Sequence, residues 1–292
     1  MRNFTIAAVL SLASLLAHAA EPRTFTDHRA LSADARITVR NLAGVIEVEA
    51  WDKAELDLAA LLGESAEKID ITGTAADLRV EVRNRKSSFS SGDGDTRLKL
   101  RVPAGASLNL DGTSADIVVR GSRGAITARS VSGDVDLAVA ARQINVQTVS
   151  GDVRLDAPAA KETRINTVSG DADVRGAAGA LSAESVSGDV QVAGGSFTQL
   201  DLKSVSGDIG VQAAFVAEAK VKVESLSGDV RVNAPASLSA EVTLKTFSGD
   251  KYCKFDVHGN SSDSKRAVLR IGEGRGEFSL TSFSGDVTLD KQ

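Results

Sequence analysis

The chain has 292 residues, a formal net charge of −5 and a single cysteine. One cysteine excludes an internal disulfide, so the fold must be held together by its core and its hydrogen bonds. The acidic balance argues against a nucleic-acid partner, because phosphate backbones are bound by surfaces rich in lysine and arginine.

The first segment has the features of an export signal. Arg2 precedes the apolar run FTIAAVLSLASLLA, and Ala17-His18-Ala19 forms a small-x-small cleavage site. The run is too short for a stable membrane span, and no later stretch is apolar enough for one. We therefore expect residues 1–19 to be a signal peptide that is removed. Its removal would leave an exported chain, periplasmic or at the cell surface or extracellular, with no transmembrane segment.

Residues 20–107 are expected to form a β-rich capping segment with one degenerate repeat. The stretch ITVRNLAGVIEV, Ile37–Val48, fits the apolar positions of the repeat described below but has Val45 where that repeat has aspartate. The rest of the segment is strand-like without repeating, and it includes the polar loop RNRKSSFSSGDGDTR. Open ends of stacked β-structures expose a core and an unpaired edge, so we predict that this segment covers one end.

A three-residue phrase recurs through residues 108–292. Ser-Gly-Asp preceded by an apolar residue occurs eight times, with successive aspartates 18, 19, 18, 19, 21, 21 and 36 residues apart. Self-similarity at such a period is the signature of a repeat fold. The repeated turns are Gly133-Asp134, Gly151-Asp152, Gly170-Asp171, Gly188-Asp189, Gly207-Asp208, Gly228-Asp229, Gly249-Asp250 and Gly285-Asp286.

Alignment on this aspartate reveals a strand in each repeat. Positions eight and six before it are mostly apolar, as at Ile144 and Val146, whereas positions seven and five are polar or charged. Such alternation indicates a strand with one buried face. The fourth residue before the aspartate is always Ser or Thr, and the third is always Val, Leu or Phe. We predict that both of these positions face inward, so that the strand bends there.

The Ser-Gly-Asp phrase is predicted to be a corner between two strands. Glycine tolerates positive φ, and Asp or Ser can bond to nearby backbone N–H groups. A second short strand follows each aspartate, as at Val153 and Leu155. Coils of 18–21 residues stacked about 4.8 Å apart would form an all-β, single-stranded parallel β-helix, or β-solenoid. A sandwich of antiparallel hairpins is the alternative fold.

Residues 251–281 interrupt the repeat. The stretches KYCKFDV and RAVLRI are expected to be strands on either side of the turn-rich HGNSSDSK. We predict that this irregular excursion helps to cap the second end of the β-solenoid.

Four segments together resemble a known family. They are the early NLAGVIEVEAWD, the segment VPAGASLNLDGTSADI, the tandem TVSGDVRL-type units and the terminal SFSGDVTL. They are similar to the bacterial envelope family of β-strand-repeat proteins labelled "putative adhesin", a domain of unknown function. The resemblance covers nearly all of the mature chain. It implies a repeat architecture in the cell envelope, and it carries no catalytic residues.

The column of aspartates requires compensation. Carboxylates stacked about 4.8 Å apart repel by about 0.9 kcal/mol per neighbouring pair in water. We predict that hydrogen bonds from turn N–H groups and the adjacent serine offset this repulsion. A row of calcium ions is the alternative, but one aspartate per coil supplies few ligands per ion. No metal or cofactor is therefore predicted.

The sequence contains no recognisable catalytic constellation. The Ser/Thr column, which includes Thr148, Thr167 and Ser204, is predicted to be an internal hydrogen-bond ladder, because no plausible base accompanies it. Cys253 falls in an inward column and is predicted to be a buried structural thiol.

We therefore predict that the chain is not an enzyme but a scaffold or adhesin-like binding surface. Its partner would be an unknown protein or glycan of the cell envelope, and not a nucleic acid. Two alternatives remain open. One is a carbohydrate-active enzyme, a polysaccharide lyase or hydrolase, on a β-helix. The other is a calcium-stabilised repeat protein.

Overall fold

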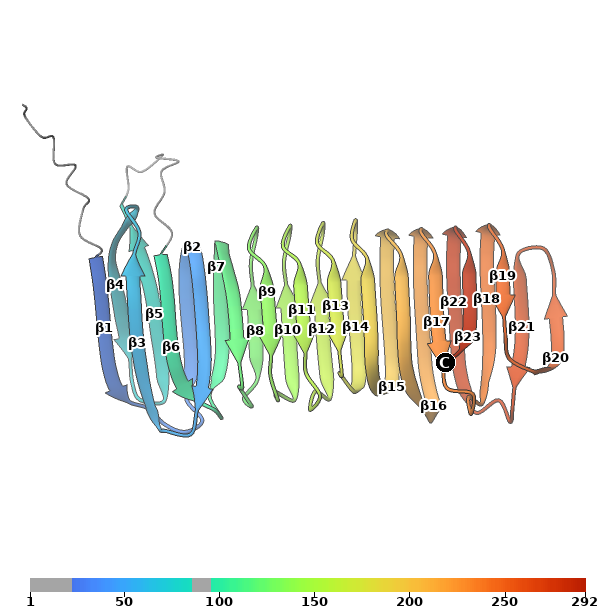
Figure 1. The fold of residues 1–292 in the computed structure, drawn as a ribbon, viewed down its shortest axis with the longest axis horizontal. Coiled ribbons are helices and arrows are strands. Elements are labelled where there is room, and N and C mark those ends of the chain that lie inside the picture. The colour runs from blue at the N-terminus through green and yellow to red at the C-terminus, as the bar shows by residue number, and fades with distance from the viewer. Residues whose placement is uncertain (1–22, 86–95) are drawn as a thin grey trace, which may run out of the picture.

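The computed structural model describes residues 23–85 and 96–292, and within them every regular element is a β-strand, which confirms the all-β class. The predicted signal peptide and most of the polar loop after Arg83 lie outside the described residues. Figure 1 shows an elongated stack whose strands stand side by side along one axis. Within the described ranges, no helix is long and apolar enough to cross a membrane.

The central repeats form two rows of parallel strands, one on each side of the Ser-Gly-Asp corner. One repeat, with a strand in each row, is called a rung here. The pre-corner row contains β8 (Ile126–Arg129), β10 (Gln143–Gln147), β12 (Glu162–Asn166) and β14 (Gly179–Ser185). The post-corner row contains β9 (Val135–Ala138), β11 (Val153–Asp156) and β13 (Ala172–Arg175).

Consecutive rungs pair in parallel and in register. Val146, for example, lies opposite Ala128 on one side and Ile165 on the other. Equivalent residues therefore stack in columns, as the repeat predicts. Hairpins pairing neighbouring repeats antiparallel, which the alternative fold requires, do not occur between the described central rungs.

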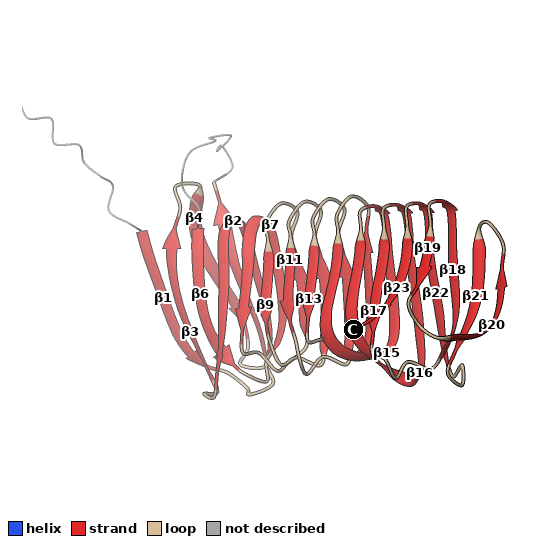
Figure 2. Cartoon of the chain, turned by 45° about the vertical axis from the view of Figure 1, so that its right-hand side comes forward, coloured by secondary structure: helices blue, strands red, loops and turns tan. Residues whose placement is uncertain are grey.

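Longer strands continue both rows toward the C-terminus. They are β15 (Val190–Ser206), β16 (Ile209–Ser227) and β17 (Val230–Ala234). The first half of β15 pairs with β13, and its second half pairs with β14, so one strand belongs to both rows. Figure 2 shows the corner loops aligned along one edge of the stack.

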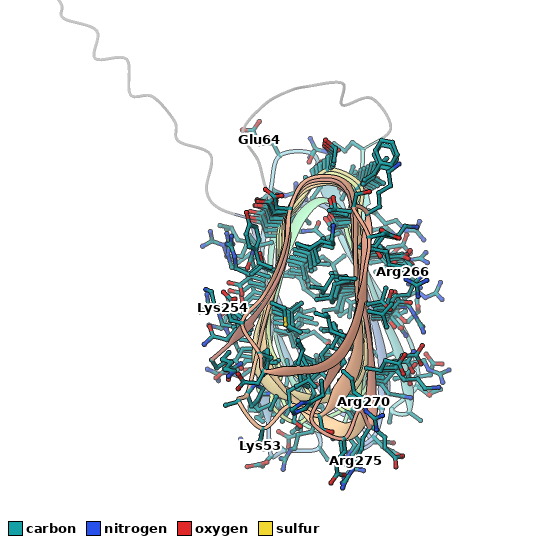
Figure 3. The ribbon with its side chains drawn as sticks, turned by 90° about the vertical axis from the view of Figure 1, so that its right-hand side faces the viewer. Lys53, Glu64, Lys254, Arg266, Arg270 and Arg275 are labelled. Atoms are coloured by element: carbon teal, nitrogen blue, oxygen red, sulfur yellow. The ribbon has the colours of Figure 1, made fainter. Side chains whose placement is uncertain are left out.

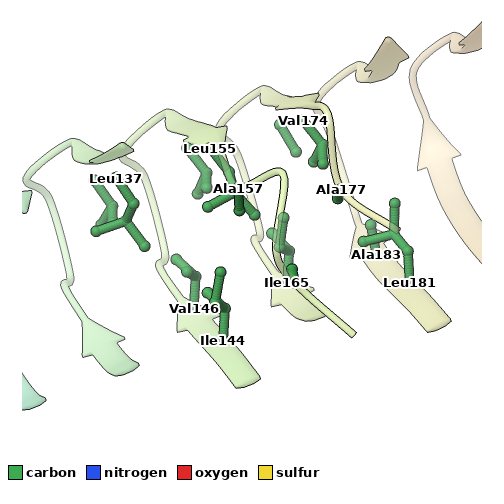
Figure 4. Close-up of a cluster of buried hydrophobic side chains, with 14 of the residues drawn as sticks. Leu137, Ile144, Val146, Leu155, Ala157, Ile165, Val174, Ala177, Leu181 and Ala183 are labelled. Carbon is green, nitrogen blue, oxygen red and sulfur yellow. The ribbon is translucent and has the colours of Figure 1, made fainter. Parts of the chain in front are cut away.

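The core lies between the two rows. Inward residues of the pre-corner row, such as Val146 and Ile165, and of the post-corner row, such as Leu155 and Val174, are buried. Figure 4 shows these side chains meeting between the walls, and the end-on view of Figure 3 shows side chains filling the interior.

The C-terminal rungs are not stacked in sequence order. This region contains β18 (Ala240–Ser248), β19 (Lys251–Cys253), β20 (Val257–Ser262), β21 (Arg266–Ile271), β22 (Gly276–Ser284) and β23 (Val287–Lys291). Strand β22 pairs in parallel with both β16 and β18, and β23 pairs with both β17 and β19. The last rung of the chain is thus inserted between the two that precede it, as the colours of Figure 1 show.

This insertion corrects the expectation of strictly consecutive coils. The inserted rung pairs in parallel and in register with the rungs on both sides, so the side-chain columns continue through it. The excursion of residues 251–281 provides the chain length for this insertion. Within it, β21 pairs antiparallel with β18 and with β20 before the chain returns as β22.

The N-terminal end has a related arrangement. Its strands are β1 (Arg23–Ala30), β2 (Arg36–Trp51), β3 (Glu55–Leu62), β4 (Ala66–Gly73), β5 (Asp77–Asn84), β6 (Thr96–Pro103) and β7 (Ser107–Arg120). Strand β2 pairs in parallel with β7 on one side and with β5 and β6 on the other. Beyond them, β3, β4 and β1 pair antiparallel. Antiparallel strands therefore lie at both ends of the parallel stack.

Candidate functional site

The corner is held by the buried Ser/Thr column. In the shorter rungs the hydroxyl accepts the N–H of the corner glycine, as between Gly170 N and Thr167 Oγ1 at 3.0 Å. In the later rungs the hydroxyl instead donates to the glycine carbonyl of the neighbouring rung, as from Thr246 Oγ1 to Gly285 O at 2.9 Å. The predicted hydrogen-bond ladder is confirmed, because these hydroxyls bond to the glycine backbone at the corners.

The glycines are required for a reason other than the predicted one. The backbone φ is not positive at the five corners from Gly133 to Gly207, so the expectation of a left-handed turn is wrong there. A Cβ on Gly170 would instead clash with the carbonyl oxygen of Gly151 in the rung beside it. The glycines stack directly on one another, and no side chain fits between them.

The aspartates form one continuous ladder. The N–H of each aspartate donates to Oδ1 of the aspartate in the neighbouring rung, at 2.7–3.1 Å, along the whole stack. The ladder runs from Asp116 to Asp229, then to Asp286 and finally to Asp250. The predicted compensation by turn N–H groups is confirmed, with the N–H supplied by the adjacent rung, whereas the predicted bond from the adjacent serine is wrong: the corner Ser and Thr hydroxyls bond to backbone atoms of the glycine corners.

Among the residues that the structure describes, no group of three or more His, Cys, Asp or Glu side chains is arranged to hold an ion. Every carboxylate of the ladder except the last accepts a backbone N–H through one of its oxygens.

The apolar column next to the corner faces solvent. We predicted that these Val, Leu and Phe side chains point inward, and this is wrong: each is between 42% and 56% exposed. The strand simply continues its alternation, with the Ser/Thr column inward and the next residue outward. We call this column the apolar ridge; in stacking order it comprises Val131, Val149, Val168, Val186, Val205, Leu226, Phe283 and Phe247.

The apolar ridge becomes bulkier toward the C-terminal end. Five valines are followed by a leucine and then by two phenylalanines whose rings stack, with centroids 4.8 Å apart and planes inclined by 3°. Lys265 Nζ lies 3.7 Å from the centroid of the Phe247 ring. The insertion of the last rung places Phe283, rather than Phe247, beside Leu226.

A shallow groove of about 650 Å³ runs along the bulky half of the ridge. One side is formed by the ridge from Val186 to Phe247, and the other by a polar column that includes Glu184, Lys203 and Glu224. Lys203 Nζ lies 3.0 Å from Glu184 Oε1, and this contact raises the pKa of Lys203. Pairing within the polar column leaves the groove mainly apolar in character.

Cys253 is the remaining candidate that the sequence singled out. Cys253 stacks on Leu289, which stacks on Val232, so its predicted column is confirmed, although the thiol is only half-buried. Burial raises the pKa of the Cys253 thiol, which disfavours the thiolate. The exposure of the ridge follows from the alternation itself, because a residue directly after an inward Ser or Thr points outward.

Comparison with known proteins gives one family and several structural neighbours. The Toastrack DUF4097 family profile matches residues 29–290. No curated protein matches the chain.

Three solved structures are similar at low identity. A "putative cell adhesion protein" from Clostridium sporogenes is 10% identical with a TM-score of 0.27, covering 92% of this chain and 100% of its own. A "putative lipid binding protein" from Parabacteroides distasonis is 17% identical with a TM-score of 0.47, covering 92% and 96%. A "putative adhesin" from the same organism is 11% identical with a TM-score of 0.32, covering 93% and 98%.

Proposed function

The chain belongs to the Toastrack DUF4097 family, and from this premise we propose that it is an exported, non-catalytic envelope scaffold with an adhesin-like binding surface. In this proposal the repeats wind as a single-stranded parallel β-helix of 18–21 residues per coil, apart from the inserted rung. The in-register parallel pairings of the central rungs support that description. The leader-like residues 1–19 support export to the periplasm or the cell surface.

The apolar ridge is the observation that carries the proposal. Soluble proteins rarely expose large contiguous apolar patches, and such patches often mark a site of interaction. Polar residues would fit these half-exposed positions without loss of core packing, yet all eight are Val, Leu or Phe. A straight, rigid row of this kind is suited to binding a partner along its length.

Charge beside the ridge indicates the chemistry of the partner. The aspartate ladder runs three residues after the ridge in every rung, and the side chains of Asp134 and Asp152 are 53% and 42% exposed. A complementary protein would present an apolar row with lysine or arginine along one side. We propose a partner protein of this kind in the cell envelope.

Site-specific photo-crosslinking in the producing cell tests this proposal. A photoreactive residue at position 226, on the ridge, is expected to capture one partner, whereas the same residue at position 222, on the polar face of the same strand, is not. Leu226 and Lys222 both lie on β16. The partner should carry a basic apolar face, and Asp189→Asn combined with Asp208→Asn should weaken its capture at low salt.

A matched set of variants controls for nonspecific hydrophobic binding. Val205→Ser with Phe283→Ser should abolish capture, whereas Val216→Ser, at an equally exposed valine away from the ridge, should leave it unchanged. Equal capture from positions 222 and 226, or none at all, would contradict the proposal. Release of reducing ends from envelope polysaccharides would contradict its non-catalytic part.

A further inference from the structure

A second hollow lies at the opposite edge of the pre-corner row. Its volume is about 610 Å³, and it extends across the rungs that begin at β10, β12 and β14. Its lining is unlike that of the apolar groove, because it contains four cations and one carboxylate. We call it the basic trough; it is formed mainly by Arg123, Arg142, Lys161, Arg164, Glu162 and Ser182.

The sequence creates this trough by placing two long cationic side chains between two glycines in the stack. Arg142 and Lys161 occupy equivalent positions in neighbouring rungs, and Lys161 N donates to Arg142 O at 2.9 Å. The equivalent positions of the flanking rungs are Gly124 and Gly179. The two long cationic side chains therefore lie between two rungs that have no side chain at the equivalent position.

Among the described residues, two cations of the trough lack the acidic partners that other cations of the pre-corner row have. Lys203, for example, pairs with Glu184 of the neighbouring rung. In the trough, Arg142 and Lys161 make no side-chain hydrogen bond or ion pair with any residue that the structure describes. Like charges directly opposite each other on neighbouring strands are destabilising. The arrangement therefore favours an external anion between them.

The other cations of the trough are only partly neutralised. Arg164 Nη2 lies 3.8 Å from Glu162 Oε1, and Arg123 Nη2 lies 2.8 Å from Asp52 Oδ1. Glu162 is the single acidic residue of the lining. The trough thus keeps a positive charge on a chain whose net charge is −5.

We infer that the basic trough binds an acidic polysaccharide. The carboxylates of the polysaccharide would pair with Arg142 and Lys161. The sugar hydroxyls would bond to Gln143, Glu162 and Ser182, which line the same trough. The lining contains no aromatic side chain on which a nucleic-acid base could stack. This site is separate from the apolar ridge, so the inference does not depend on the proposed function.

Titration with oligogalacturonate, followed by calorimetry, tests the inference on the mature chain. Binding is expected at low salt and should weaken as salt is added. Arg142→Gln with Lys161→Gln should weaken it about tenfold or more, because both anchoring charges are lost. Glu162→Gln should tighten it several-fold, because the opposing charge is removed while hydrogen bonding is kept.

The controls separate a specific site from general charge. Arg79→Gln with Lys245→Gln removes the same charge from exposed positions outside the trough and should leave affinity unchanged. Neutral dextran should not bind, and Leu226→Ser on the ridge should have no effect. All variants should keep the melting temperature of the parent, since the substituted side chains are exposed.

Three results would overturn the inference. The first is absence of oligogalacturonate binding at millimolar concentration. The second is equal loss of affinity in the trough variant and the Arg79/Lys245 control. The third is binding of single-stranded DNA with the same affinity and the same dependence on Arg142 and Lys161, which would indicate charge alone rather than a saccharide site.

Discussion

The shorter rungs of residues 126–193 and the longer rungs of residues 199–291 use one repeated phrase in two ways. In the shorter rungs the corner hydroxyl accepts an N–H of its own glycine, and the rungs follow sequence order. In the longer rungs the hydroxyl donates to the neighbouring corner, and the last rung is inserted out of order. The ladder and the ridge continue unbroken through both regions.

This difference shows what the phrase specifies. The Ser-Gly-Asp corner sets the register between neighbouring rungs, because the glycine stack and the aspartate ladder run through the shorter and the longer rungs alike. It does not fix which rung is the neighbour. That choice depends on the connection, and here the 36-residue interval between the last two aspartates allows the chain to pass over the end and return.

Truncation after residue 275 should have the largest effect. It removes β22 and β23, which lie inside the stack, so β18 and β19 lose their parallel neighbours. Because stability in repeat proteins is carried by contacts between nearest neighbours, we expect loss of amide protection throughout residues 240–271. Hydrogen exchange would measure it.

Removal of residues 23–30 is the matched control for this truncation. Strand β1 is an outer strand that pairs with β3 and with no other described strand, so its loss should affect the N-terminal end alone. Unchanged protection of residues 240–271 in the C-terminal truncation would show that the inserted rung is not structurally required.

Gly170→Ala should be the next largest effect, at about 3 kcal/mol of unfolding free energy. The new Cβ would meet the backbone carbonyl of Gly151, which cannot move without separating the rungs. Gly210→Ala is the control, because its Cβ would meet only the flexible Gln191 amide. Equal urea midpoints for the two variants would contradict the steric account.

Thr167→Val tests the corner of the shorter rungs. It leaves the buried N–H of Gly170 without its acceptor, at an expected cost of about 1–3 kcal/mol. Thr246→Val, in a longer rung, removes a donor to the Gly285 carbonyl and should cost less, about 1 kcal/mol. Urea unfolding of both variants would measure the two losses of stability, and identical losses would show that the two corners do not differ energetically.

Asp171→Asn should have the smallest effect. Asparagine keeps the Oδ1 acceptor for the N–H of Asp189 while removing one charge from the ladder, so the melting temperature should be unchanged or slightly higher. Asp171→Ala should cost about 1 kcal/mol, because the acceptor is lost. Neither calcium nor chelator should shift the melting temperature, and a shift with calcium would revive the calcium-stabilised alternative.

Local pattern in the sequence was sufficient to predict the strands, the columns and the ladder. The alternation around Ile144 and Val146 is a property of one strand, and the regular spacing of the aspartates carries it from rung to rung. The outward direction of the valine column was missed because an apolar residue next to the corner was assumed to be buried.

Features that depend on which rungs are neighbours could not be predicted in the same way. The insertion places Phe283, rather than Phe247, beside Leu226, and because both rungs carry the same side-chain columns, no local signal separates this order from the consecutive one. The basic trough likewise needs Arg142, Lys161 and the glycines of two other rungs to be placed in register first. The function of a repeat surface therefore emerges only after its stacking order is known.

Disulfide formation on the ridge tests that order most directly. In a Cys253→Ser background, Leu226→Cys and Phe283→Cys occupy adjacent rungs about 4.8 Å apart, within the Cα separation that a disulfide allows. Leu226→Cys and Phe247→Cys lie two rungs apart, at about 9.6 Å, which is too far. Mild oxidation should therefore crosslink the first pair and not the second. Crosslinking of the second pair without the first would mean that the coils stack in sequence order and that the inserted rung is wrong.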